Sequence, residues 1–338
     1  MQSFSVVIVG AGPGGLACAR LLAEHGLDVL VLERKPVVGP KVCGGGITWD
    51  GLIKRVPEHL IDGAFPSQHI KSNYQQTVIQ SSDPIVATIR REVLGKWMCQ
   101  QAENAGAVIK TSCLVNRIDH DSVSTTLGDF GYRYLIGADG SSSIVRKYLR
   151  LSTEKVGLGI HFRVPGNFDK MEWHLNNTLF NNGYGWIFPY QNMASVGIYG
   201  VKSYNNPKKM LAHLTQWAKQ QKIPVDGMKP QAGLINFDYR GWRFGNKMLI
   251  GDAAGLASGL TGEGMYSALV SGETSARVIL DPEYDCHALQ QLIKKQQKHQ
   301  QIVEISAKHT LVNIALMEIL ILALRSRLLP FSMLEMAD

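Results

Sequence analysis

The first 34 residues contain the pattern that most restricts how this chain can fold. An apolar run typical of a buried strand (Phe4 to Val9) leads into glycines spaced G-x-G-x-x-G. A helical stretch follows from Gly14 to His25, and a second apolar run from Val29 to Leu32 ends at Glu33. This order of strand, glycine turn, helix, strand and acid predicts a dinucleotide-binding β-α-β unit of the Rossmann type.

The glycines of this unit have separate steric tasks. Gly10 permits the tight turn from strand to helix, Gly12 lets the backbone approach a pyrophosphate, and Gly15 lets the helix pack closely on the sheet. The helix N-terminus at Pro13 and Gly14 offers N–H groups and the positive end of its dipole to phosphates. All five residues are therefore candidates for cofactor binding.

Glu33 stands at the end of the second strand, where a carboxylate can accept hydrogen bonds from ribose hydroxyls. An acid at this position disfavours a 2′-phosphate, so NADP is not expected here. The motif alone does not distinguish FAD from NAD. The alternative, a glycine-rich turn without a ligand, leaves the strand, helix and acid around it unexplained.

Composition places the chain among globular proteins and narrows its partners. Its 338 residues are 45% hydrophobic and 19% charged, which allows one large domain or two ordinary ones. The formal charge of +7 would suit nucleic acid, an anionic membrane surface or an anionic cofactor. No basic tract with interleaved aromatic residues predicts nucleic-acid binding. Five scattered cysteines without a CxxC pair argue against disulfides and zinc, and for a reducing compartment.

The expected location is the cytoplasm. The nucleotide-binding strand starts at residue 4, which leaves no room for a signal peptide, and no apolar run reaches the ~18–20 residues of a bilayer span. One run, Ile314 to Leu324, is nearly all apolar and precedes Arg325 and Arg327. It is either a helix packed on the body or a membrane-facing or lipid-tunnel helix, and the second interpretation predicts peripheral contact with the inner face of the membrane.

The rest of the chain alternates between helical and strand patterns. Helices are expected at 91–105, 207–220 and 262–279 and within 286–329. A turn is expected at Gly128-Asp129. The expected fold is α/β, with a discontinuous nucleotide-binding domain, an inserted, mainly antiparallel β-sheet substrate domain and a C-terminal helical segment. The expected boundaries are 1–65, 90–150 and 241–285 for the nucleotide-binding domain, 66–89 and 151–240 for the substrate domain, and 286–338 for the C-terminal segment.

Three further motifs point to the cofactor. They are GADGSSSIVR at 137–146, GDAAG at 251–255 running on to TGEG at 261–264, and Arg91, which opens the helix that contains Trp97. Together with the N-terminal fingerprint they resemble the FAD-binding pattern of the para-hydroxybenzoate hydroxylase class of flavoproteins. Their order and spacing match over nearly the whole chain, so FAD is the expected cofactor.

This resemblance implies roles for the matching residues. Glu33 would bind the adenosine ribose, and Arg34 would lie along the adenine. Arg91 would reach the pyrophosphate or ribityl region as a fixed cation. Asp139, followed by Gly140, would hold the glycine turns near the pyrophosphate rather than take part in chemistry.

The second acid motif has an implied role at the flavin. Asp252, after Gly251, would accept a hydrogen bond from a ribityl hydroxyl. Gly262 and Gly264 would place backbone N–H groups at the N1/O2 edge of the flavin, which becomes anionic on reduction and is stabilised by a helix N-terminus. The alternative for both Asp139 and Asp252 is the capping of turns.

Two more segments resemble the geranylgeranyl reductase family. KVCGGG at 41–46 looks like its K-x-C-G-G signature, and YGWIFP at 184–189 looks like its Y-x-W-x-F-P signature. The resemblance implies hydride delivery from reduced flavin to a C=C bond of an isoprenoid chain, completed by a proton donor. The expected partners are an apolar lipid and either NAD(P)H or a ferredoxin as electron donor. No second G-x-G-x-x-G is present, so a nicotinamide would bind transiently.

The second signature also has a direct physical interpretation. Tyr184, Trp186 and Phe188 alternate along a predicted strand, so their side chains share one face and form an aromatic wall. Such a wall suits a flat flavin or an apolar chain. The alternative is ordinary core packing, which is also the expectation for His161 as a structural histidine.

Cys43 is the first residue to test for chemistry. It lies in the loop with Gly44 and Gly45, which we expect to contact the cofactor, and near Lys41, whose charge would lower its pKa and make it an acid or a redox partner. The alternative is an inert loop residue. The catalytic candidates are thus Cys43, Tyr184 and Trp186, and no metal site is expected.

Four functions remain in competition. The leading one is a flavin-dependent reductase of an apolar, isoprenoid lipid, and the next is a monooxygenase of an aromatic or apolar substrate, which would share the fold and FAD site. A third is a lipid-binding flavoprotein without turnover. A fourth, a simple NAD-dependent dehydrogenase, would leave the motifs at Asp139 and Asp252 without a purpose.

Overall fold

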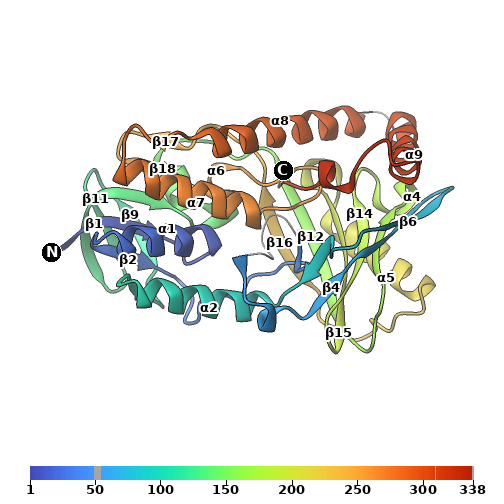
Figure 1. Ribbon diagram of the computed structural model, residues 1–338, viewed down its shortest axis with the longest axis horizontal. Helices are drawn as coiled ribbons and strands as arrows, with labels where there is room; N and C mark the ends of the chain where they lie inside the picture. Colours follow the sequence, from blue (N-terminus) through green and yellow to red (C-terminus); the bar gives the residue numbers. More distant parts are fainter. Residues whose placement is uncertain (49–54, 309, 337–338) are drawn as a thin grey trace.

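The computed structural model describes residues 1–48, 55–308 and 310–336, and its elements form two large β-sheets with helices around them (Figure 1). In the described part, the first sheet has eight strands, with β17-β18-β11-β1-β2-β8 in order and β10 and β9 extending from β11. Its strands are β1 (Gln2–Val9), β2 (Val29–Leu32), β8 (Val108–Lys110), β9 (Val115–Ile118), β10 (Ser122–Thr125), β11 (Gly128–Gly137), β17 (Arg243–Phe244) and β18 (Lys247–Leu249).

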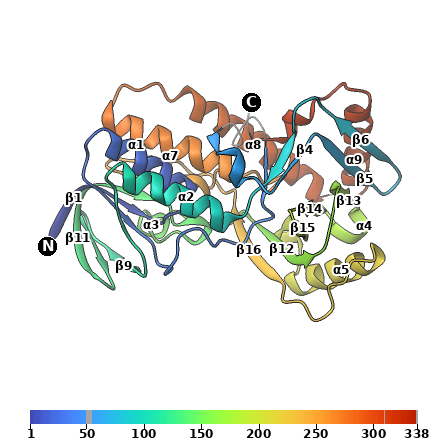
Figure 2. The same cartoon turned by 60° about the horizontal axis from the view of Figure 1, so that its bottom comes forward.

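The central strands of the first sheet are parallel and covered on both faces. Val6 and Ile8 pack under α1 (Pro13–Glu24), α2 (Arg91–Asn104) and α7 (Met265–Leu280), which Figure 2 shows together on one side. Val7 and Val9 face the β9–β10 hairpin, α3 (Ile144–Tyr148), α6 (Gly251–Ala254) and α8 (His287–Lys308). Continuous apolar strands are what a parallel sheet buried on both faces requires.

The second sheet has seven strands in the described residues, in the order β16-β12-β15-β14-β13-β5-β6, and only its β13–β5 pair is parallel. The strands are β5 (Ser67–Ser72), β6 (Gln76–Gln80), β12 (Val156–Pro165), β13 (Met171–Leu175), β14 (Tyr184–Pro189), β15 (Met193–Val201) and β16 (Gln231–Asn236). One face packs on α4 (Asn177–Phe180) and α5 (Pro207–Gln220), where Leu214 and Trp217 are buried. The opposite face carries a second buried cluster that includes Trp186, Phe188 and Tyr199.

A small sheet and the C-terminal segment complete the fold. The small sheet orders β3 (Gly46–Thr48), β7 (Val86–Thr88) and β4 (Gly63–Phe65). After α8, α9 (Thr310–Arg325) packs on β5 and β6, and the short helix η5 (Phe331–Leu334) follows. No helix in the described ranges is both long and apolar enough to cross a bilayer.

The predicted fold class is confirmed, with local differences. The predicted turn at Gly128-Asp129 is wrong: these residues begin β11, and the turn falls at 126–127. The helix predicted to start at 262 starts at Met265, because Gly262 has a φ of +71° that a helix does not accept. The domain boundaries stay a prediction. Those at 65 and 89 assign β4 to the nucleotide-binding domain and β7 to the substrate domain, although these two strands pair with each other.

Candidate functional site

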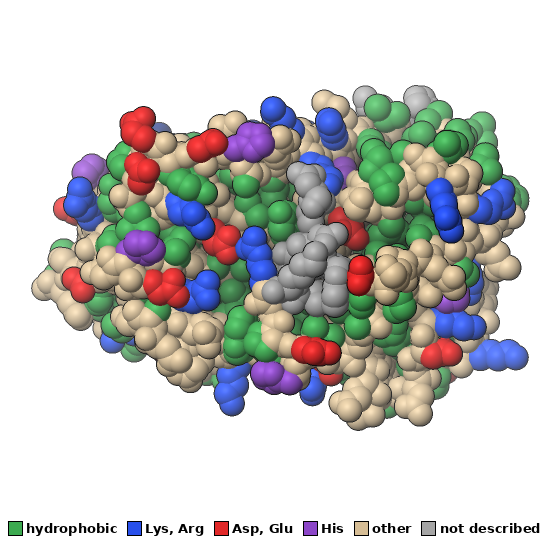
Figure 3. Space-filling view, viewed as in Figure 1, with side chains coloured by type: hydrophobic (Ala, Val, Ile, Leu, Met, Phe, Trp, Pro, Cys, Tyr) green, Lys and Arg blue, Asp and Glu red, His purple; other side chains and the backbone are tan. Residues whose placement is uncertain are grey.

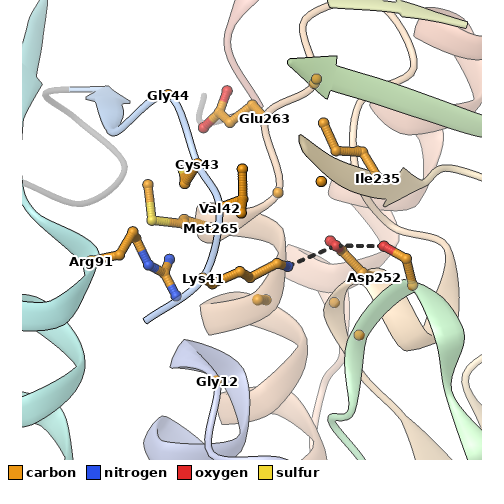
Figure 4. A pocket seen from close by; sticks show the side chains of 18 of the residues that line it. Gly12, Lys41, Val42, Cys43, Gly44, Arg91, Ile235, Asp252, Glu263 and Met265 are labelled. Atoms are coloured by element: carbon orange, nitrogen blue, oxygen red, sulfur yellow. Dashed lines mark hydrogen bonds and ion pairs between the residues drawn. The ribbon is translucent and has the colours of Figure 1, made fainter. Parts of the chain in front are cut away.

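A cavity of about 770 Å³ lies between the two large sheets and is lined by residues from both and from the C-terminal segment (Figure 4). Every cofactor-binding and catalytic candidate predicted from the sequence lies on its wall. The structure therefore brings together residues that the chain separates widely. Their individual roles toward a cofactor stay predictions.

The turn from β1 to α1 is as tight as its glycines require. Gly10 has a φ of +104°, and a Cβ there would lie 2.5 Å from the Ala138 carbonyl oxygen. A Cβ on Gly15 would lie 2.3 Å from the carbonyl oxygen of Gly10. At Gly12, by contrast, a Cβ would meet only Ala138, at 3.8 Å, so its open side faces the cavity. The helix α1 starts there with Pro13 at its first position.

Gly14 serves packing between helices. A Cβ there would lie 2.4 Å from the carbonyl oxygen of Ala268, and one on Gly272 would lie 2.3 Å from the carbonyl oxygen of Gly14. The two glycines let α1 and α7 touch backbone to backbone. This contact holds the N-termini of α1 and α7 close to the same cavity.

Glu33 and Arg34 lie on the cavity wall at the end of β2. The Glu33 carboxylate accepts hydrogen bonds from the backbone N–H groups of Ala11 and Lys35, both at 2.9 Å. Each carboxylate oxygen has a second acceptor site, so these bonds fix the group without exhausting it. Arg34 is exposed at the rim.

The polar end of the cavity, formed by the turn at residues 10–15 with Glu33, Arg91 and Asp252, is a cradle for a ligand. Arg91 shows best that this cradle suits an anionic ligand. It is only 5% exposed at the start of α2, and its Nε has no hydrogen-bond partner within the described part of the chain. Figure 4 shows its guanidinium group pointing into the cavity. A buried guanidinium N–H without an acceptor is costly, and a pyrophosphate would supply the acceptor that Nε lacks. FAD therefore fits the residues present.

The two acid motifs hold the far wall of the cradle. Asp139 Oδ2 accepts a hydrogen bond of 2.6 Å from the backbone N–H of Ile144, and burial raises the pKa of this carboxyl group. Asp252 Oδ2 accepts from Lys41 Nζ at 3.0 Å and from Ser141 Oγ at 3.1 Å. Asp139 therefore caps a turn, whereas Asp252 faces the cavity through a polar network that a ribityl hydroxyl could join.

The loop before α7 is organised around Ser258. Ser258 Oγ accepts from the N–H of Thr261 at 3.0 Å, and the N–H of Gly262 donates to the Ser258 carbonyl at 3.0 Å. We expected the N–H of Gly262 to face the flavin, but it is engaged within the loop. A Cβ on Gly264 would lie 2.9 Å from Asp252 Oδ1, so this glycine lets the carboxylate approach the N-terminus of α7.

The predicted aromatic wall is confirmed on β14. Tyr184, Trp186 and Phe188 share one face and lie in a row along it, with ring centroids 6.0 Å and 5.8 Å apart and ring planes tilted by 51° and 34°. Trp173 joins them from β13, 4.7 Å from Phe188, and Tyr199 joins from β15, 5.6 Å from Tyr184. The wall lines the cavity, so it is both core packing and a binding surface.

Tyr184 also reaches the loop before α7. Its hydroxyl donates to the carbonyl of Thr261 at 2.5 Å, and burial raises its pKa. The phenol is thus neutral and its proton is engaged. Tyr184 connects the aromatic wall to the cofactor side of the cavity.

Cys43 lies where this wall meets the cradle. A Cβ on Gly44 would lie 3.3 Å from the indole of Trp186, so the loop lies flat against that ring. The N–H of Gly45 points at Cys43 Sγ, 3.4 Å away. Lys41, the expected partner of the thiol, is instead paired with Asp252. The catalytic role of Cys43 stays a prediction.

Several residues of the site were not predicted from the sequence. Tyr190 donates to the Gly44 carbonyl at 3.0 Å, and Tyr199 donates to the Gly259 carbonyl at 2.8 Å; no motif marks either tyrosine. The motif at 41–46 pointed to Lys41, but not to its pairing with Asp252. His161 is buried, as a structural histidine should be, and bonds Ser195 Oγ at 2.7 Å, but it also lines the cavity.

The far end of the cavity is apolar. It is closed by side chains of α9 and of the segment that follows, namely Met317, Leu320, Leu324, Phe331 and Leu334. Ile321 and Leu324 pack on Ile70 of β5. One face of the apolar run predicted from the sequence, Ile314 to Leu324, thus lines this apolar end of the cavity, which is the chamber.

Comparisons with known proteins agree with this geometry. A family model described as an FAD binding domain matches residues 3–272. Digeranylgeranylglycerophospholipid reductase 2 of Methanosphaera stadtmanae is 30% identical over 339 residues, covering 88% of this chain and 84% of that protein. The chloroplastic geranylgeranyl diphosphate reductase of Oryza sativa subsp. japonica is 28% identical over a match that covers 82% of this chain and 66% of that protein.

Solved structures share the fold over most of the chain. A geranylgeranyl bacteriochlorophyll reductase-like protein from Thermoplasma acidophilum superposes with a TM-score of 0.81 at 20% identity, covering 99% of this chain and 96% of that one. The flavin-dependent brominase Bmp2 superposes with a TM-score of 0.66 at 17% identity, covering 89% of this chain. At these identities the likeness is one of architecture.

Proposed function

Because this chain belongs to the geranylgeranyl reductase family of FAD-dependent oxidoreductases, we propose that it reduces C=C bonds in the isoprenoid chains of an apolar lipid. FAD is its cofactor. The observation that carries the proposal is the continuity of the cavity: a polar cradle at one end runs into an aromatic and aliphatic chamber at the other. The names of the relatives above specify geranylgeranyl groups, which are isoprenoid chains.

The residues of the chain would act by holding, orienting and excluding water. Bound FAD, once reduced, supplies a hydride. The N-terminus of α1 and the Arg91 guanidinium group would hold the pyrophosphate by charge-assisted hydrogen bonds. Asp252 would fix the ribityl chain, and the N-terminus of α7 would stabilise negative charge near the flavin edge. Trp186 and its aromatic neighbours would keep water away from an apolar substrate.

The test starts from the purified protein and its visible spectrum. Holoenzyme reduced with dithionite without oxygen is mixed with lipids that carry geranylgeranyl chains, and both flavin reoxidation and product mass are followed. A reductase gives reoxidation together with products that have gained two hydrogens for each bond reduced. Reoxidation only with oxygen and coupled to hydroxylation would favour the monooxygenase. Reoxidation no faster than that of free flavin would favour the non-catalytic flavoprotein.

We propose NAD(P)H or a ferredoxin as the electron donor. The G-x-G-x-x-G at residues 10–15 is occupied by the cofactor in this proposal, and the sequence holds no second one. A nicotinamide would therefore bind transiently. Stopped-flow reduction of the bound flavin by NADH, NADPH and a reduced ferredoxin, compared side by side, identifies the donor.

We further propose that the protein is cytoplasmic and touches the inner face of the membrane through α9. The outer face of this helix and the turn after it expose Leu311 (81%), Ile319 (61%) and Leu328 (78%), beside Arg325 and Arg327. Figure 3 shows hydrophobic side chains gathered over α9, with basic side chains at their edge. Apolar and cationic groups together suit an anionic lipid surface.

Vesicle sedimentation tests this contact. The protein should sediment with vesicles that contain anionic lipid, and a variant with Leu311, Ile319 and Leu322 changed to Gln should stay in solution. The matched control is Leu127→Gln, which alters an exposed leucine on the opposite sheet. Equal sedimentation of all three proteins would refute the contact.

A further inference from the structure

Glu263 is a cavity residue that has no part in holding FAD or in forming the aromatic wall. It lies in the TGEG loop between Gly262 and Gly264 and lines the cavity where the cradle meets the chamber (Figure 4). Oε2 accepts a hydrogen bond of 2.8 Å from the backbone N–H of Met336, and Oε1 is paired with Thr48 Oγ1 at 3.4 Å. Two elements that are distant in sequence thus hold the carboxyl group in one orientation.

The surroundings of Glu263 favour its neutral form. Desolvation by the surrounding protein outweighs the hydrogen bonds and the attraction of Lys295 on α8, and raises the pKa of Glu263 to about 7. Tyr184 interacts electrostatically with both Glu263 and Cys43, and Glu335 lies on the cavity wall next to Met336 in the sequence. A carboxyl group that titrates near neutral pH can hold a proton and release it, which is what a general acid requires.

Two neighbouring groups, Tyr184 and Lys41, are already engaged by other partners. The hydroxyl proton of Tyr184 is engaged by the carbonyl of Thr261, and burial raises its pKa, so it is a poor acid. Cys43 Sγ accepts from the N–H of Gly45, which leaves the thiol proton available, so Cys43 is the competing donor that the Glu263 variants test against. Lys41 is paired with Asp252. Glu263 is a carboxyl group on this part of the wall, and its protonated form can face the substrate.

We propose that Glu263 is the proton donor that completes reduction of the C=C bond. The proposal rests on the function proposed above, in which reduced FAD supplies the hydride. The O–H bond of the Glu263 carboxyl breaks as its proton adds to one alkene carbon, and the hydride adds to the other. The C=C bond becomes a single bond with two new C–H bonds, FAD is left oxidised, and Glu263 is left as a carboxylate that regains its proton from water.

Glu263→Gln separates proton transfer from structure. The amide can still accept from Met336 and keeps the shape of the side chain, but it has no acidic proton. We expect the variant to bind FAD with an unchanged visible spectrum, and to lose at least ~100-fold in the single-turnover rate of flavin reoxidation by lipid. Glu273→Gln, which alters a half-buried glutamate of α7 paired with Arg55, is the matched control and should keep the wild-type rate.

The pH profile gives a second readout. Because the acid form is required, the wild-type rate should be high below pH 7 and fall as pH rises through about 7. Glu263→Asp should keep this limb at a lower rate, and Glu263→Gln should lack it. Infrared difference spectra of the wild type should show a protonated carboxyl band that titrates with this same pKa and is absent from the Gln variant.

The outcomes separate the two proposals. If the wild type reduces no isoprenoid C=C bond, the proposed function fails. If the wild type is active while Glu263→Gln keeps both its rate and its pH limb, Glu263 is not the proton donor. A Gln variant that fails to bind FAD leaves the decision to Glu263→Asp and the infrared titration, and a wild type without the titrating band overturns the assignment.

Discussion

The cofactor cradle and the substrate chamber share a cavity but are built by different means. The cradle is made of backbone: Gly10, Gly14 and Gly15 each face a carbonyl oxygen at a distance that no Cβ could occupy. The chamber is made of side chains, with aromatic rings in a row along β14 and aliphatic groups from α9. A surface made of backbone fits one ligand shape, whereas a side chain can be substituted by a larger or smaller one without moving the backbone. The cradle should therefore tolerate little substitution and the chamber more.

The strongest test of this comparison is Gly10→Ala. The new Cβ would lie 2.5 Å from the backbone oxygen of Ala138, so we expect loss of FAD and destabilisation well beyond the ~1–3 kcal/mol of a strained φ alone. Gly106→Ala is the matched control, because Gly106 has the same φ of +104° and nothing within 4 Å of its Cβ position. Thermal unfolding and flavin absorbance measure both. Equal effects of the two changes would show that φ, not close contact, limits the cradle.

A second test concerns Arg91, the buried cation of the cradle. Arg91→Met should raise the Kd for FAD about 10- to 100-fold, since a hydrogen bond to a charged group contributes about 1.5–3 kcal/mol. The protein without FAD should lose little stability, because Arg91 Nε has no hydrogen-bond partner among the described residues. Arg90→Gln changes an exposed, paired neighbour and should leave FAD binding unaltered. Fluorescence titration of FAD decides, and a destabilised Arg91→Met protein would contradict the assignment of Arg91 to the cofactor.

The same difference in construction explains what the sequence could predict. Glycine spacing and strand-ending acids are local consequences of backbone geometry, so the β-α-β unit and the candidates of the cradle could be found without coordinates. The alternation of Tyr184, Trp186 and Phe188 is also local. Tyr190, Tyr199 and the pairing of Lys41 with Asp252 depend on how distant strands and loops meet, and no spacing rule contains that information.

Tyr184→Phe tests the junction between the two regions. It removes the hydrogen bond to the Thr261 carbonyl but keeps the ring in the aromatic wall. We expect a loss of about 1 kcal/mol in the free energy of unfolding and a Kd for FAD within about threefold of wild type. Tyr74→Phe, at an exposed tyrosine, is the control. A large loss of FAD would mean that the hydroxyl belongs to the cradle rather than to the chamber.

The smallest expected effect lies behind the chamber, where β13 and β5 run parallel. Burial alone would raise the pKa of Glu172, but hydrogen bonds from His174 and Lys71 outweigh it and lower the pKa to about 2. A carboxylate with a depressed pKa stabilises the fold above its ordinary pKa near 4.5, and this contribution disappears as pH falls toward 2. The difference in unfolding free energy between wild type and Glu172→Gln should therefore shrink across this window. A difference independent of pH would refute the pairing.

The cradle draws on both early and late parts of the chain, since Gly10 and Gly264 border the same cavity. During synthesis the chain must therefore extend through α7 before FAD, the yellow cofactor, can bind to the complete cradle. Colour in a cell extract would then report chains that extend through α7, and products truncated before α7 would stay colourless however well their first β-α-β unit had formed.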